Sequence, residues 1–157
     1  MKVRAALLTA MVLAATSANG FAAGARTSTI PAPEDFMARI VRLTVSSRNA
    51  ELWALLHPAH QQLVPRSRFI RCRTEPPGTV PSRVVSSAFQ GKRYERIDVP
   101  LIPQHTSTAV TLKVVVERGK VREPATVTVH AVWTGLRWAW FLPASSIPAF
   151  RAGKCPP

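Results

Sequence analysis

The sequence predicts an α+β domain in which helices come first and an antiparallel sheet follows. Apolar residues recur at three- and four-residue spacing up to about residue 73, and they alternate with polar residues from about residue 80 onward. A run of helices followed by a run of strands is typical of the α+β class. The chain has 157 residues, 46% of them apolar, which suits one domain with its own hydrophobic core.

The N-terminus has the three parts of a secretory signal peptide. Lys2 and Arg4 form a basic head, an uncharged apolar run follows, and small residues continue to Ala25. The apolar run is shorter than the roughly 20 residues that span a bilayer. We expect a cleaved signal peptide over 1–25, with Ala18 as an alternative cleavage site. No cysteine lies near either site, so we expect no lipid anchor.

After this peptide we expect a flexible lead-in over 26–33 and a single domain over 34–157. Pro33 and the acids that follow it are typical of a helix start, and Pro58 ends a later helix. Phe36, Ile40 and Leu43 give the first helix an apolar face. The expected helices cover 34–47, 50–57 and 65–73, with one further turn over 59–64.

The second half of the mature chain predicts an antiparallel meander. Two strands lie on either side of Gly91, either as a hairpin or as one long bulged strand. Three long strands follow with tight turns between them, and we expect them to twist and curl around the helices. The expected strands cover 83–90, 93–99, 107–117, 121–133 and 136–142, and a short helical turn covers 144–150.

Export decides how the two cysteines are interpreted. Cys72 and Cys155 are the only cysteines, and disulfides persist in the oxidising surroundings of exported proteins. We therefore predict a Cys72–Cys155 disulfide that holds the C-terminal tail against the middle of the domain. Two unrelated free thiols are the alternative.

The net charge of +13 suggests an anionic partner, but export argues against nucleic acid. Nucleic acid would also need exposed aromatic residues among the basic ones, and the four tryptophans are explained by core positions. The densest basic run is Arg66, Arg68, Arg71 and Arg73. It is either an anion-binding patch for envelope polymers or lipid headgroups, or a solvated helix face.

Two stretches resemble small secreted bacterial proteins of the nuclear transport factor 2-like superfamily. The first runs from Glu51 through Trp53 and His57-Pro58 to Phe69 and Cys72. The second comprises Trp138-Ala139-Trp140-Phe141-Leu142 and the tail Gly153-Lys154-Cys155-Pro156. The resemblance covers about 34–156. It implies a cone-shaped fold in which a strongly curved sheet wraps around helices. The superfamily includes isomerases, dehydratases and non-catalytic modules, so the resemblance implies no single function. If the cone holds a pocket, we expect Trp53, Leu56, Trp138 and Trp140 to line it.

Enzymes of that superfamily place Asp, Tyr or His inside the cone, and no such pattern carries over here. Tyr94 is the only tyrosine, and Glu95 and Asp98, on a predicted strand, fall on opposite faces without a recognisable partner. His57 and His60 are three residues apart, but Pro58 breaks the helical geometry of a metal site. We expect His57 to end a helix and His60 to be exposed. The sequence therefore predicts no catalytic residues, metal or cofactor.

These observations favour an exported, non-catalytic binding or scaffold module of the cell envelope, as a monomer or a homodimer. Its partner is either a small apolar ligand or an anionic envelope component. A small isomerase or dehydratase that uses the cone, and a cationic binder of anionic envelope polymers, are the alternatives.

Overall fold

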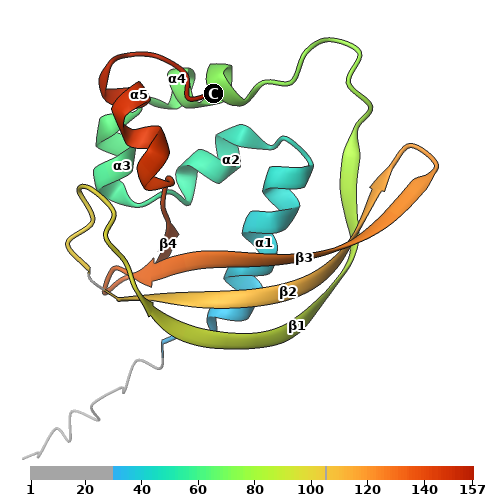
Figure 1. Ribbon diagram of the computed structural model, residues 1–157, viewed down its shortest axis with the longest axis horizontal. Helices are drawn as coiled ribbons and strands as arrows, with labels where there is room; N and C mark the ends of the chain where they lie inside the picture. The colour runs from blue at the N-terminus through green and yellow to red at the C-terminus, as the bar shows by residue number, and fades with distance from the viewer. Residues whose placement is uncertain (1–29, 105) are drawn as a thin grey trace, which may run out of the picture. The chain divides into compact units, whose positions relative to one another are not determined.

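The computed structural model describes residues 30–104 and 106–157, and the folded unit is Pro31–Pro157. The predicted signal peptide and the lead-in up to residue 29 lie outside the described residues. Helices precede strands as predicted, which confirms the α+β class (Figure 1). The elements are α1 Pro33–Val45, α2 Asn49–Ala54, α3 Pro58–Leu63, α4 Arg66–Arg73, β1 Ser82–Arg96, β2 Thr106–Arg118, β3 Val121–Trp133, β4 Trp138–Trp140, η1 Ala144–Ser146 and α5 Ile147–Arg151.

The four strands form one antiparallel sheet in the order β1-β2-β3-β4. The chain passes through Gly91 as a single long strand, so the bulged-strand alternative is correct and the hairpin is not. The β1–β2 register shifts between Val84 and Ser86 and again between Phe89 and Gly91. Extra residues bend a strand and increase its twist. In Figure 1 the three long strands accordingly curve beneath α1.

The last strand is much shorter than the sequence predicts. Alternation suggested a strand over 136–142, but β4 has only three residues and Leu136 is 90% exposed in the preceding turn. Beyond β4, the backbone N–H of Leu142 donates to the His60 side chain instead of a neighbouring strand. On the side of β4 that faces away from β3, Trp140 forms an isolated parallel β-bridge with Leu56. The connection between α2 and α3 therefore takes the place next to β4.

Helix α1 joins the sheet to the other helices because two of its sides are apolar. Met37 and Val41 pack against Val110 and Leu112 of the sheet, while Leu43 faces the helical layer. The start of α1 is as predicted, with a proline and two acids in its first turn. Its sheet-facing side defines the concave face of the sheet, which is consistent with the arrangement in Figure 1.

A second cluster fills the space between α2, α4, α5 and β4. Phe69 is fully buried and meets Trp140 edge to face, with ring centroids 6.1 Å apart. Leu52, Leu56 and Phe150 complete the same cluster. Because α5 contributes Phe150 to this core, the C-terminal helix is packed onto the domain in addition to being tied to it by a covalent bond.

Candidate functional site

The four residues expected to line a pocket belong instead to the packed interior or its margin. Leu56 is fully buried and Trp140 is 9% exposed, while Trp53 and Trp138 are half-buried. Each indole N–H donates to a backbone carbonyl: Trp53 to Val64, Trp138 to Pro31 and Trp140 to Leu52. These tryptophans therefore join segments of the fold, and four surface pockets of the described residues are lined by other side chains.

Trp140→Phe should lower the free energy of unfolding by about 1–3 kcal/mol, because it removes a buried hydrogen bond and leaves space where the larger indole ring packed, although the N–H of Leu55 still donates to the carbonyl of Leu52. Urea unfolding measures the change. Trp138→Phe is the matched control: its hydrogen bond to Pro31 is exposed, so its loss should cost less than about 1 kcal/mol. An equal loss of unfolding free energy in the two variants would contradict the greater importance of the buried Trp140 hydrogen bond.

His60 is completely buried, contrary to the exposed position expected from the sequence. Pro58 begins a new helix, α3, and this helix turns His60 toward the core. Its Nδ1 accepts the backbone N–H of Leu142 at 3.1 Å, and its Nε2 donates to the carbonyl of Pro100 at 2.9 Å. Nδ1 is an acceptor, so the ring is neutral with its proton on Nε2. Burial lowers the pKa of His60 further below its usual value.

His57 stands between α2 and α3, and its side chain caps the start of α3. Its Nδ1 accepts the backbone N–H of Ala59 at 3.3 Å. Burial, with the neighbouring His60 as a smaller cause, lowers the pKa of His57. The two rings are 6.3 Å apart, and both nitrogens of His60 are already engaged. This pair is therefore not arranged to hold a metal ion, in agreement with the argument from Pro58.

The groups considered for catalysis are spread out. Tyr94 is 77% exposed, and Asp98 lies beyond the end of β1 rather than on a strand, which corrects the expected strand over 93–99. Glu95 has two partners that the sequence did not reveal: His130 Nε2, at 2.5 Å from its Oε2, and Arg93. Register explains the group, since Arg93, Ala109 and His130 form one row across the sheet.

These contacts define an ion-pair cluster on the convex face of the sheet. Hydrogen bonds from His130 first, and then from Arg93, lower the pKa of Glu95. The carboxylate therefore stays ionised and paired with Arg93 at neutral pH. Such an acceptor is poorly suited to act as a general base, which works best with a pKa near the operating pH.

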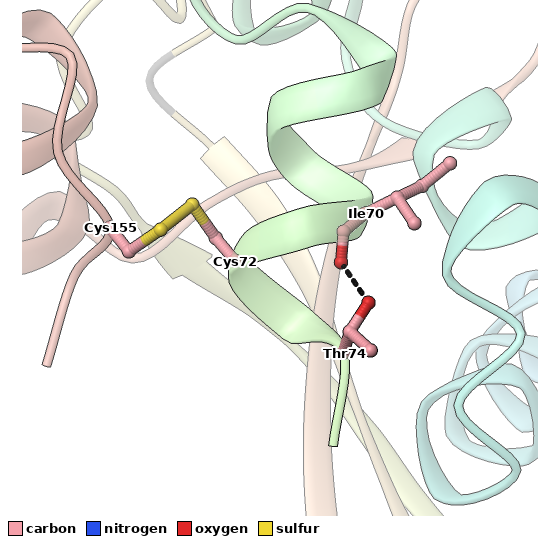
Figure 2. The surroundings of a disulfide bond; sticks show 4 residues. All are labelled: Ile70, Cys72, Thr74 and Cys155. Atoms are coloured by element: carbon pink, nitrogen blue, oxygen red, sulfur yellow. Dashed lines mark hydrogen bonds between the residues drawn. A yellow bond between two sulfur atoms is a disulfide. The ribbon is translucent and has the colours of Figure 1, made fainter. Parts of the chain in front are cut away.

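The predicted disulfide is present and organises the other end of the molecule. Cys72, in the last turn of α4, is bonded to Cys155 in the C-terminal tail, with Cα atoms 5.2 Å apart (Figure 2). Next to it the Thr74 hydroxyl donates to the carbonyl of Ile70 and closes the end of α4. The bond joins positions 83 residues apart and brings the chain after α5 alongside α4.

The four arginines of the basic run do not form one patch. At 100° per residue, Arg68 and Arg71 share one side of α4 while Arg73 lies on the opposite side. Arg71 is exposed and Arg68 is half-buried beside Gly153 of the tail. Arg66 is exposed at the first position of α4. Arg73 instead lies over the ring of Phe69, 5.4 Å from its centroid.

The tertiary structure adds two cations to this side of α4. The disulfide joins two stretches that contain no Asp or Glu, 52–74 and 124–157. The second stretch carries Arg151 and Lys154, both exposed and both next to the tail that meets α4. We call the resulting surface the cationic end, and its residues are Arg68, Arg71, Arg151 and Lys154, since Arg66 lies on the same side of α4 as Arg73.

Several carboxylates of the described residues are paired away from these cations. Glu34, Glu95 and Glu117 each bind a Lys or Arg of the sheet, and Glu51 binds Arg48 just before α2. Glu75, shortly after α4, accepts a hydrogen bond from the Ser47 hydroxyl. Within residues 30–104 and 106–157, by contrast, no carboxylate lies within 4.0 Å of a cation of the cationic end. Sequence reasoning found the α4 arginines but missed Arg151 and Lys154. The signal for them was the absence of any acid after Glu123.

No protein-family model, curated protein or solved structure matches this chain. In the described parts of the chain, no helix is long and apolar enough to cross a bilayer.

Proposed function

We propose that the protein is an exported, non-catalytic binding module that holds anionic polymers of the cell envelope at its cationic end. The observation that carries the proposal is that the disulfide brings together four cations of α4, α5 and the tail, and no carboxylate of the described residues pairs with them. A disulfide is typical of proteins outside the cytoplasm, and polymers with phosphate or carboxylate groups are the anions met there. Arginine binds such groups with paired hydrogen bonds.

The proposal includes a cone-shaped, nuclear transport factor 2-like architecture. A bent antiparallel sheet around an N-terminal helix supports that assignment, as do the sequence resemblance and the meander order of the strands. In this protein the space inside the sheet is occupied by packed side chains such as Met37, Leu112 and Trp140. Binding at the surface is therefore favoured over a ligand inside the cone, and over the isomerase or dehydratase alternative.

Binding of the purified, oxidised protein to soluble polyphosphate tests the proposal. Arg68→Gln/Arg71→Gln should weaken binding about tenfold or more at low salt, because the charges of the half-buried Arg68 and the exposed Arg71 are both lost. Binding of the unchanged protein should also fall steeply as salt is raised, since salt screens exposed charges beyond a Debye length of about 8–10 Å.

Arg39→Gln/Arg42→Gln is the matched control. It removes two exposed cations of α1 that have no carboxylate partner among the described residues, so the net charge changes equally. Equal weakening by both double variants would mean that net charge alone attracts the polymer, and the proposed site would be wrong. Tighter binding to phosphatidylglycerol vesicles than to polyphosphate, with the same dependence on Arg68 and Arg71, would assign the surface to membranes and contradict the polymer proposal.

A further inference from the structure

A small pocket of about 200 Å³ lies on the inward side of α4, away from Arg68 and Arg71. Its walls come from α4, the chain after β4, α5 and the tail beyond the disulfide. The residues that matter here are Phe69, Arg73, Leu142, Ser146, Phe150 and Pro156. The pocket is smaller than the roughly 300–1,000 Å³ of sites that enclose drug-sized ligands, so its occupant has a small body.

Arg73 supplies the charge of this pocket. Its guanidinium is held from one side by the Phe69 ring and by Asn49, whose Oδ1 accepts from Nε at 3.4 Å. Asn49 also donates to the Arg73 carbonyl at 2.9 Å, which fixes the end of α4. Among the described residues, no carboxylate lies within 4.0 Å of Arg73. Within the described residues, the two terminal nitrogens of the guanidinium, Nη1 and Nη2, donate no hydrogen bond to a protein group.

This arrangement is electrostatically incomplete. Burial lowers the pKa of Arg73, which shows that desolvation penalises its charge, and no neighbouring anion offsets that penalty. A carboxylate bound to the two terminal nitrogens would offset it with paired hydrogen bonds. Phe69, Leu142 and Phe150 form the apolar floor of the pocket, while Ser146 and Arg73 supply polar groups to its walls. A ligand that fits this lining joins an anionic head to a small apolar body.

We propose that this pocket binds a small apolar carboxylate, with the carboxylate on Arg73 and the apolar body between Phe150 and Pro156. The chemistry fits a free organic acid and equally the C-terminal carboxylate of an apolar peptide. The site is separate from the outward side of α4 that the polymer proposal uses. The experiments can therefore contradict the pocket proposal while supporting the polymer proposal, or the reverse.

Titration of the oxidised protein by NMR with phenylacetate tests the proposal, and acetyl-Gly-Leu replaces phenylacetate in a parallel arm for the peptide source. We expect saturable shifts at Phe150, Ser146 and Arg73 in at least one arm, and the arm that binds more tightly identifies the source. Phenylacetamide, which lacks the charge, and acetate, which lacks the apolar body, should each bind at least about tenfold more weakly. No saturable shift in either arm would overturn the proposal.

Two variants locate the ligand. Arg73→Met keeps the apolar stem over Phe69 and should weaken phenylacetate binding about 10- to 100-fold, because hydrogen bonds to a charged group are lost. Ser146→Leu keeps Arg73 but fills the pocket, and should abolish the shifts. Both should bind polyphosphate as the unchanged protein does, and the dispersion of their NMR spectra shows whether they are folded.

Arg71→Met is the matched control, since it removes one α4 charge outside the pocket. It should leave phenylacetate binding unchanged while it weakens polyphosphate binding. If Arg71→Met weakened phenylacetate binding as much as Arg73→Met, the carboxylate would be bound by general surface charge, and the pocket assignment would be wrong.

Discussion

Replacing both Cys72 and Cys155 with serine should lower the free energy of unfolding by about 4 kcal/mol. The bond closes a loop between positions 83 residues apart, and the chain-entropy relation gives about 4 kcal/mol for a loop of that size. All four strands of the sheet lie inside this loop. The unfolded state of the variant therefore gains freedom over most of the domain, while the folded state keeps its apolar contacts.

Urea unfolding of the double-serine variant and of the oxidised protein measures this difference, with the unchanged protein in reductant as the second comparison. Reductant should shift the unchanged protein to the midpoint of the variant and should leave the variant unaffected. A difference below about 1 kcal/mol would contradict the prediction. Intact mass after alkylation without reductant is the control, because a disulfide-bonded protein takes up no alkyl group.

His60→Leu should cost about 2–5 kcal/mol of stability. The substitution leaves the buried N–H of Leu142 and the partly buried carbonyl of Pro100 without their partner, and an unpaired buried group costs about 1–3 kcal/mol. His130→Gln is the control, since His130 is partly exposed and bonded at the surface. Urea unfolding at pH 7.5 compares the two. A loss no larger than that of the control would show that the His60 contacts contribute little.

Acidification should destabilise the unchanged protein between about pH 7 and pH 5. Burial holds the pKa of His60 in the folded state below the value near 6.5 of an unfolded histidine. The unfolded chain therefore binds the proton first, so stability is fully present above about pH 6.5 and is lost as the pH falls below it. Protonation of Nδ1 would also place a proton against the N–H of Leu142.

Other titrating groups near His60 set the controls for this experiment. His57 contributes in the same direction because burial lowers its pKa too. The carboxylates with lowered pKa, Glu34, Glu95 and Glu117, titrate below about pH 4.5 and do not act in this window. The slope of stability against pH should shrink in His60→Leu without vanishing. An unchanged slope would contradict the role of His60.

Most of the fold could be predicted from local patterns. The bounds of the strand over 121–133 are the predicted ones, and the helices begin within one residue or so of their predicted starts. Prolines account for much of this accuracy, since Pro33, Pro58 and Pro65 stand at or next to helix starts. The strand over 136–142 was overestimated, because alternation cannot show that Leu142 donates to a histidine instead of a strand.

The site depended more on long-range contacts. His60 lies in a sequence with no local feature that marks it as buried, and its two partners are 40 and 82 residues away. Glu95 and His130 are 35 residues apart and meet only because β2 lies between their strands in a fixed register. The excess of basic residues is evident from the sequence. The sequence does not show which of these cations lie on the same surface.

The sequence by itself determined the class of fold, the pairing of Cys72 with Cys155 and the excess of positive charge. These follow from periodicity, from the number of cysteines and from composition, which are properties of the chain in any conformation. Only the tertiary structure decided that the indole of Trp140 bonds to Leu52, that Arg73 turns inward to a pocket, and that Arg151 and Lys154 lie near α4. These features depend on which distant segments of the chain pack together. Because the interior is close-packed, that arrangement depends on all the core residues together and not on local sequence.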